Sequence, residues 1–151
     1  GPGVRATDGG KGADLGAVMI RREDWPEALH ALVDLRAAMP FAWGYQDCCA
    51  FAAAAVEAMT GIDPMADLRG YHSRETAEAI LAAHGGLEAA VSARLGEPVG
   101  TALARRGDVV LVDVAQVSAL GICLGDFAAA PGPRGLEWVD RAFWRAAWRV
   151  G

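Results

Sequence analysis

The chain has 151 residues, 53% of them hydrophobic and 22% charged, which is typical of one globular domain with its own core. Its net charge of -5 lacks the basic excess of a general nucleic-acid binder. No apolar run is long enough to cross a bilayer, so neither nucleic acid nor membrane is an expected partner. The three cysteines fit neither a disulfide framework nor zinc-type spacing, and we expect no metal or cofactor.

Residues 1–18 differ from the rest of the chain in composition. Gly1-Pro2 matches a common protease scar, and the glycine-rich stretch after it has no hydrophobic periodicity. We therefore expect a flexible tail over residues 1–18, whose native origin stays open. A single domain is expected over residues 19–151, with Met19 as a candidate native start.

The first half of the chain predicts helices. Asp24 and Glu27 have the spacing of a capping box, and apolar residues follow them at helical spacing until Pro40 ends the helix. Asp47 is the expected N-cap of a second helix, from Cys48 to about Thr60. Its many alanines suit a central, closely packed position.

Two further helices precede a change of character. Ser73 is the expected cap of a third helix that runs to His84, and Gly85-Gly86 ends it. A short fourth helix is expected over residues 87–95. Together these four segments make the first part of the chain helical.

The second half predicts strands. Gly107-Asp108 marks a turn, with the glycine tolerating a conformation that other residues resist. β-Rich runs follow at residues 109–112, 117–124, 136–139 and 147–150. Helices first and strands later indicate an α+β fold, with helices packed on an antiparallel sheet.

Cys48 is the candidate nucleophile. A cysteine in the first turn of a helix lies at the positive end of the helix dipole, which favours the thiolate. The thiolate is the form that attacks carbonyl groups. A cysteine hydrolase also needs a histidine close to that sulfur.

Three motifs resemble those of a known superfamily. They read Trp-Gly-Tyr-Gln-Asp-Cys-Cys-Ala-Phe at residues 43–51, Arg-Gly-Asp-Val-Val at 106–110 and Ala-Leu-Gly-Ile-Cys-Leu-Gly at 119–125. In this order they resemble the NlpC-type cell-wall peptidases, a branch of the papain-like cysteine hydrolases. The resemblance spans residues 41 to about 131. It implies a papain-like fold with Cys48 at the nucleophile position.

The chain is similar along its whole length to a subgroup of short proteins from phage, prophage and gene-transfer-agent tail gene clusters. This similarity includes Phe-x-Trp-Gly-x-x-Asp-Cys-Cys near residue 45 and Ala-Trp-Arg-Val at residues 147–150. It implies phage-tail-like proteins or a peptidoglycan-type ligand as partners. It also implies a cytoplasmic location before assembly into a phage-like particle.

Two departures from the family pattern affect the expected chemistry. The general-base histidine of the family maps onto Ala119, and the third polar residue maps onto Ala128-Ala129-Ala130. Alanine can neither accept a proton nor orient an imidazole. Loss of a general base costs on the order of 10²–10⁴-fold in rate. His72, in the loop before the third helix, is the candidate substitute base.

The sequence therefore leaves two hypotheses open. In the first, the domain is a catalytically degenerate binding or assembly module. Its binding residues are then Trp43, Tyr45, Asp47 and Cys49. The tryptophans at 43, 138, 144 and 148 then supply either aromatic surface or core packing.

In the second hypothesis the domain is an active peptidoglycan endopeptidase or amidase. It would use Cys48, a nonstandard base such as His72, and backbone amides at the helix start as an oxyanion hole. A histidine nitrogen within hydrogen-bond reach of the Cys48 sulfur would favour this second hypothesis.

Overall fold

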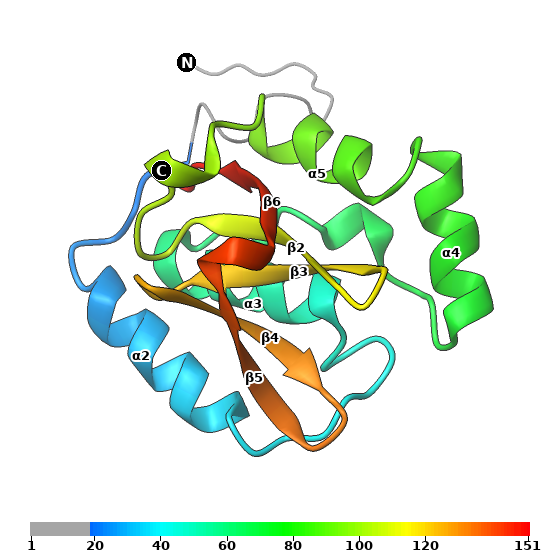
Figure 1. Ribbon diagram of the computed structural model, residues 1–151, viewed down its shortest axis with the longest axis horizontal. Coiled ribbons are helices and arrows are strands. Elements are labelled where there is room, and N and C mark those ends of the chain that lie inside the picture. Colours follow the sequence, from blue (N-terminus) through cyan, green and yellow to red (C-terminus); the bar gives the residue numbers. More distant parts are fainter. Residues whose placement is uncertain (1–18) are drawn as a thin grey trace.

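Helices occupy the first half of the chain and strands the second, as the sequence predicts (Figure 1). The structure is a computed structural model and describes residues 19–151, so the tail expected over residues 1–18 lies outside it. The α-helices are α2 (Trp25–Arg36), α3 (Cys48–Thr60), α4 (Arg74–Ala83) and α5 (Leu87–Leu95). The strands are β2 (Val109–Val114), β3 (Val117–Cys123), β4 (Phe127–Gly132), β5 (Gly135–Asp140) and β6 (Trp144–Trp148). Short 3-10 turns lie at Ala66–Leu68, Thr101–Leu103 and Arg141–Phe143.

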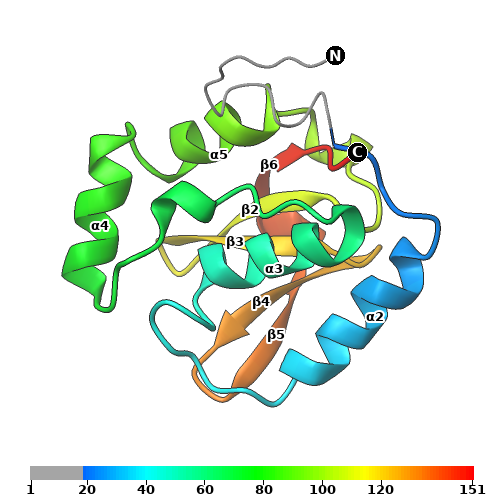
Figure 2. The ribbon, with the colours of Figure 1, turned by 180° about the vertical axis from the view of Figure 1, so that it is seen from behind.

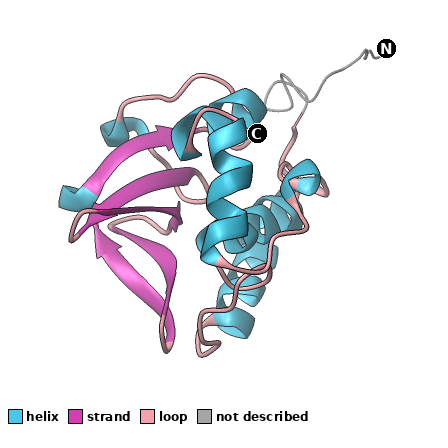
Figure 3. Ribbon diagram, turned by 90° about the vertical axis from the view of Figure 1, so that its right-hand side faces the viewer, coloured by secondary structure: helices cyan, strands magenta, loops and turns pink. Residues whose placement is uncertain are grey.

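The strands form one antiparallel sheet in the order β5-β4-β3-β2-β6, within the part of the chain that is described. Figure 3 shows α2 to α5 on one side of this sheet. The predicted α+β class, with helices on an antiparallel sheet, is thereby confirmed. None of the helices in residues 19–151 is long and apolar enough to span a membrane.

Helix α3 is the central helix of the fold. Figure 2 shows it crossing the sheet between α2 and α4. Small side chains let its backbone approach the sheet, and Phe51, Val56 and Met59 on it are fully buried. Gly61 ends the helix in a left-handed conformation, with φ 83°.

Of the two capping predictions for α2 and α4, the one for α4 is confirmed and the one for α2 is wrong. Ser73 and Thr76 form a capping box at the start of α4, as the serine indicates. The capping box predicted at Asp24 is wrong, because Asp24 makes no side-chain cap hydrogen bond. Its backbone, at φ -96° and ψ 23°, is not in the extended conformation from which a cap residue reaches the helix N–H groups.

Strand positions differ from the prediction at two places. The last strand covers residues 144–148 and not 147–150, because the Val150 N–H donates to the Asp108 carboxylate. Strand β4 has an Ala-Ala-Ala-Pro core of low β propensity, so residue type alone does not reveal it. The family resemblance, in contrast, implied a strand at Ala128–Ala130.

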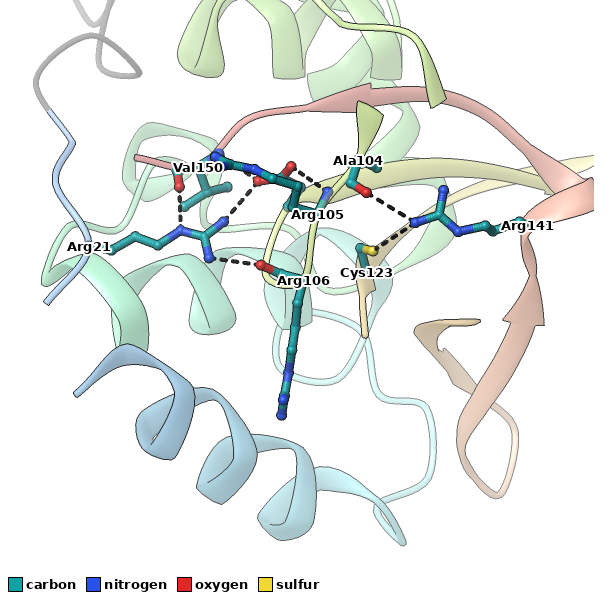
Figure 4. A network of polar contacts seen from close by, with 8 residues as sticks. Arg21, Ala104, Arg105, Arg106, Cys123, Arg141 and Val150 are labelled. Carbon is teal, nitrogen blue, oxygen red and sulfur yellow. Dashed lines mark hydrogen bonds and ion pairs between the residues drawn. The ribbon is translucent and has the colours of Figure 1, made fainter. Parts of the chain in front are cut away.

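Asp108 ties the start of β2 to both ends of the domain. Its buried carboxylate accepts from the Arg21 guanidinium at 2.9 Å, the Arg105 N–H at 2.9 Å and the Val150 N–H at 3.1 Å. Figure 4 shows Arg21 also reaching the carbonyl groups of Val150 and Arg106. Gly107 has φ 94°, as predicted for this turn, and a Cβ there would lie 2.7 Å from Arg21.

Candidate functional site

Cys48 is the first residue of α3 and lines a cavity of about 790 Å³. One wall comes from Phe41 and Trp43 in the loop before α3, and another from the α4 side chains Ala77, Ile80 and Leu81. The tip of the β2–β3 hairpin, residues 116–119, closes a third side. Cys48 thus lines a cavity whose walls are largely apolar.

Cys48 and Cys49 are adjacent thiols in the first turn of α3. The neighbouring Cys49 thiol lowers the pKa of Cys48, against the opposing effect of burial. The neighbouring Cys48 thiol, together with burial, raises the pKa of Cys49. Cys48 is therefore the thiolate-forming member of the pair, and Cys49 keeps its proton.

A backbone amide of the sheet also affects the Cys48 thiol. The Cys123 N–H donates to the Asp108 carbonyl in the β2–β3 ladder. N–H groups facing β2 alternate along β3, so the Leu120 N–H faces away from β2. The β3–β4 ladder runs over Ile122 and Cys123 and ends before Leu120. The Leu120 amide therefore takes part in neither ladder, and it further lowers the pKa of the Cys48 thiol.

Asp47 organises the loop around the cysteines. Its side chain, 3% exposed, accepts the Ala50 N–H at 2.9 Å, which makes Asp47 the N-cap of α3 as predicted. It also accepts the Gly44 N–H at 2.6 Å and the Tyr71 hydroxyl at 2.7 Å. Burial, together with the bond to Asp47, raises the pKa of Tyr71. Asp47 is thus a structural anchor that joins the loop, the helix and Tyr71.

We expect Asp47→Ala to lower the free energy of unfolding by about 3 kcal/mol, because three hydrogen bonds of about 1 kcal/mol each are lost. Urea denaturation of the two proteins measures this difference. Tyr71→Phe is the matched control, since it removes one of these bonds and should cost about 1 kcal/mol. A loss of only about 1 kcal/mol in Asp47→Ala would show that the cap alone matters.

The residue that replaces the expected base lines the same cavity as Cys48. Ala119 lines it from β3, but it also packs against the buried cluster on the sheet face away from α3. The chain's three histidines all lie within the described residues, and none of them lines this cavity. His72 is exposed, and its backbone N–H donates to the Thr76 hydroxyl. Cys48 and Ala119 thus share the cavity lining without their side chains being on the same face of the sheet, and His72 lies outside the cavity.

The Ala128–Ala130 segment does not reach the cavity either. Its side chains are buried on β4, with Ala129 packed in the core beneath α3 and Ala128 on the other face of the sheet. Pro131 is the β4 residue that lines the cavity. No polar group on this segment can therefore orient a base near Cys48.

The predicted aromatic binding residues behave differently from one another. Trp43 lines the cavity, is 39% exposed and packs edge-on against Phe41 with ring centroids 4.7 Å apart. Tyr45 does not line it and instead lies under the Arg36 guanidinium at 4.2 Å. Trp144 and Trp148 are core residues, and Trp138 on β5 is exposed. Trp43 is thus the tryptophan at the candidate site.

Sequence reasoning missed Tyr71 and the apolar face of α4. Tyr71 follows Gly70, whose φ of 101° lets the chain turn, and that glycine is the one local signal for its inward position. Ala77, Ile80 and Leu81 have ordinary helical spacing, which does not distinguish a cavity wall from a core-facing stripe. Among residues 19–151, no group of His, Cys, Asp and Glu side chains is arranged to hold a metal ion.

Comparison with known proteins identifies a family for the chain. A family model described as "Domain of unknown function (DUF6950)" matches residues 20–150, which is nearly all of the described part. No curated protein matches the chain.

Proposed function

The chain belongs to the DUF6950 family, a domain family of unknown function, and we propose from its site that it is a catalytically degenerate, papain-like domain of NlpC type. It acts as a binding or assembly module in a phage tail or gene-transfer-agent particle and is cytoplasmic before assembly. Its partners are phage-tail-like proteins or a peptidoglycan-type ligand, as the family resemblance implies.

The NlpC-type assignment is supported by the relation of two elements. Cys48 begins the helix that packs on the antiparallel sheet, and Ala119 lies on the strand that lines the same cavity. The shared cavity is what the motif order implied, although Ala119 also packs against the buried cluster on the sheet face away from α3. The cavity in front of Cys48 is accordingly the proposed binding site.

The proposal that the domain does not catalyse hydrolysis rests on the alanine at position 119. Cleavage of an amide needs a general acid to protonate the departing nitrogen and a base to activate water. Besides the two cysteines, the ionisable side chains lining the cavity are Asp47, Tyr71, Arg74 and Glu78. Asp47 and Tyr71 are hydrogen-bonded to each other, the guanidinium of Arg74 has no acceptor site for a proton, and Glu78 is exposed on α4. The described lining therefore supplies no imidazole for either proton transfer.

A second candidate, an active cysteine hydrolase, is favoured by the lowered pKa of Cys48. A lowered pKa supplies the nucleophile but not the proton transfers that follow its attack. We therefore rank the hydrolase below the binding module.

We expect wild-type protein to release no product from muropeptides or cross-linked peptidoglycan fragments. The absence of an imidazole in the described lining of the cavity is the reason, and liquid chromatography with mass spectrometry is the measurement. Cys48→Ala serves as the matched control and should give the same trace. Product formed by wild type and abolished in Cys48→Ala would make the domain a hydrolase, and His72→Ala would then test the substitute base.

A further inference from the structure

We propose that Cys48 accepts an acyl group from a thioester and that the adjoining cavity holds the acyl chain. This inference rests on the proposed lack of hydrolytic turnover, because an acyl group stays on a cysteine when no base activates water against it. It names the chemical class of the ligand, which the binding-module proposal leaves open.

The thiol pair suits thioester exchange better than amide cleavage. The departing group of a thioester is a thiolate, whose conjugate acid has a pKa of about 8.5, so it leaves without a general acid. An amide nitrogen must be protonated as it leaves, and the described lining of this cavity holds no imidazole to do so. Cys48 therefore meets the requirement of the first reaction and not of the second.

The proposed step is balanced without a co-reactant. An electron pair on the Cys48 thiolate forms a new C–S bond to the thioester carbonyl carbon, and the C=O π electrons move to oxygen. The N–H groups of Cys48 and Cys49, in the first turn of α3, have no partner within the helix and can stabilise that oxyanion. The C=O bond then re-forms and the original C–S bond breaks, so the carrier leaves as a thiolate.

The cavity fits an acyl chain in size and in chemistry. Its volume of about 790 Å³ is within the usual range for small-molecule sites. Leu68, Ala77, Ile80, Leu81 and Leu87 line it with aliphatic surface, and Ile80, Leu81 and Leu87 are only partly buried. Apolar side chains left partly open beside a nucleophilic sulfur favour an apolar group attached to that sulfur.

A redox function for the same pair is disfavoured by geometry. Consecutive Cα atoms are about 3.8 Å apart, and disulfides usually need about 4.4–6.8 Å. Cys48 and Cys49 both lie in the first turn of α3, so a bond between them would require that turn to unwind. Cys49 is therefore a proton-bearing partner that positions and stabilises the Cys48 thiolate, and not a resolving cysteine.

The test is incubation of the full chain with S-octanoyl-N-acetylcysteamine, followed by intact-mass measurement and peptide mapping. We expect one octanoyl group on Cys48, removable by neutral hydroxylamine, and none in Cys48→Ala. The buried Cys123, whose pKa is raised by burial, should stay unmodified as the internal reference. The acetyl thioester should react about tenfold more slowly, since its chain buries less apolar surface in the cavity.

Cys49→Ala and Cys49→Ser separate the positioning function of Cys49 from simple packing. Cys49→Ala should slow acylation about tenfold at neutral pH, because it removes the neighbouring thiol that lowers the pKa of Cys48. Cys49→Ser keeps a donor and should restore most of the rate. The difference should vanish at alkaline pH, where Cys48 ionises in both variants.

Three results would each overturn a different part of the proposals. No adduct on Cys48 together with no release of octanoic acid overturns acyl uptake, and the lack of turnover then still stands. Repeated release of octanoic acid that Cys48→Ala abolishes overturns the lack of turnover and the holding of the acyl chain. Equal rates with the acetyl and octanoyl thioesters overturn the assignment of the cavity to the chain.

Discussion

Asp108→Ala should lower the free energy of unfolding by about 4 kcal/mol, because it strips a buried carboxylate from three donors. Those donors are the Arg21 guanidinium, the Arg105 N–H and the Val150 N–H. Arg21 would be left with its charge only 13% exposed and without its ion-pair partner. Chemical denaturation of the wild type and the variant measures the difference.

Asp113→Ala is the matched control, since Asp113 lies on β2 and pairs with Arg145 at 3.0 Å on the surface. That pair is more exposed, so its loss should cost less than about 1 kcal/mol. Similar losses for the two variants would contradict the anchoring function of Asp108. The Gly-Asp motif would then have no structural explanation in this fold.

The sequence predicts the elements whose signals are local. The ends of α3 follow from Asp47 and Gly61, and the start of α4 follows from Ser73, because caps act through atoms three or four residues away. Strand β4 could not be recognised from its residue types, because its alanines carry no preference for a strand. Pairing with its neighbours β3 and β5 holds it in the sheet. Tertiary pairing decides such a segment.

The candidate site also has some features that the sequence predicts and others that depend on distant partners. Motif order led us to expect Cys48 and Ala119 to face one another; both line the cavity, but Ala119 packs on the sheet face away from α3. Motif order could not show that Tyr71, and not its neighbour His72, turns inward, because that choice depends on a partly buried hydrogen bond to Asp47. Nor could spacing show that Tyr45 stacks on Arg36 instead of facing the cavity. These details depend on partners distant in the chain or outside the motif.

Ala119→His should make iodoacetamide alkylate Cys48 about tenfold faster at neutral pH, since a nearby imidazolium lowers a thiol pKa by at least about one unit. Ala119 and Cys48 line the same cavity, but Ala119 pairs with Val112 on the sheet face away from α3, so the variant tests whether the longer imidazole side chain reaches the sulfur. The rate should also persist to lower pH than in wild type, because the thiolate–imidazolium pair stays ionised until the thiolate is protonated. Alkylation followed by peptide mapping measures both effects, with Cys123 as the reference.

Ala119→Gln is the control, because glutamine is polar and of similar size but carries no charge. Equal alkylation rates in the histidine and glutamine variants would show that position 119 does not face the sulfur, and the NlpC-type assignment would fail. Hydrolysis of muropeptides need not return in Ala119→His. A hydrolase also needs a group that orients the imidazole, and Ala128–Ala130 lie buried in the sheet without a polar side chain. A faster thiol without turnover would thus indicate that the domain lost its base and its orienting group together.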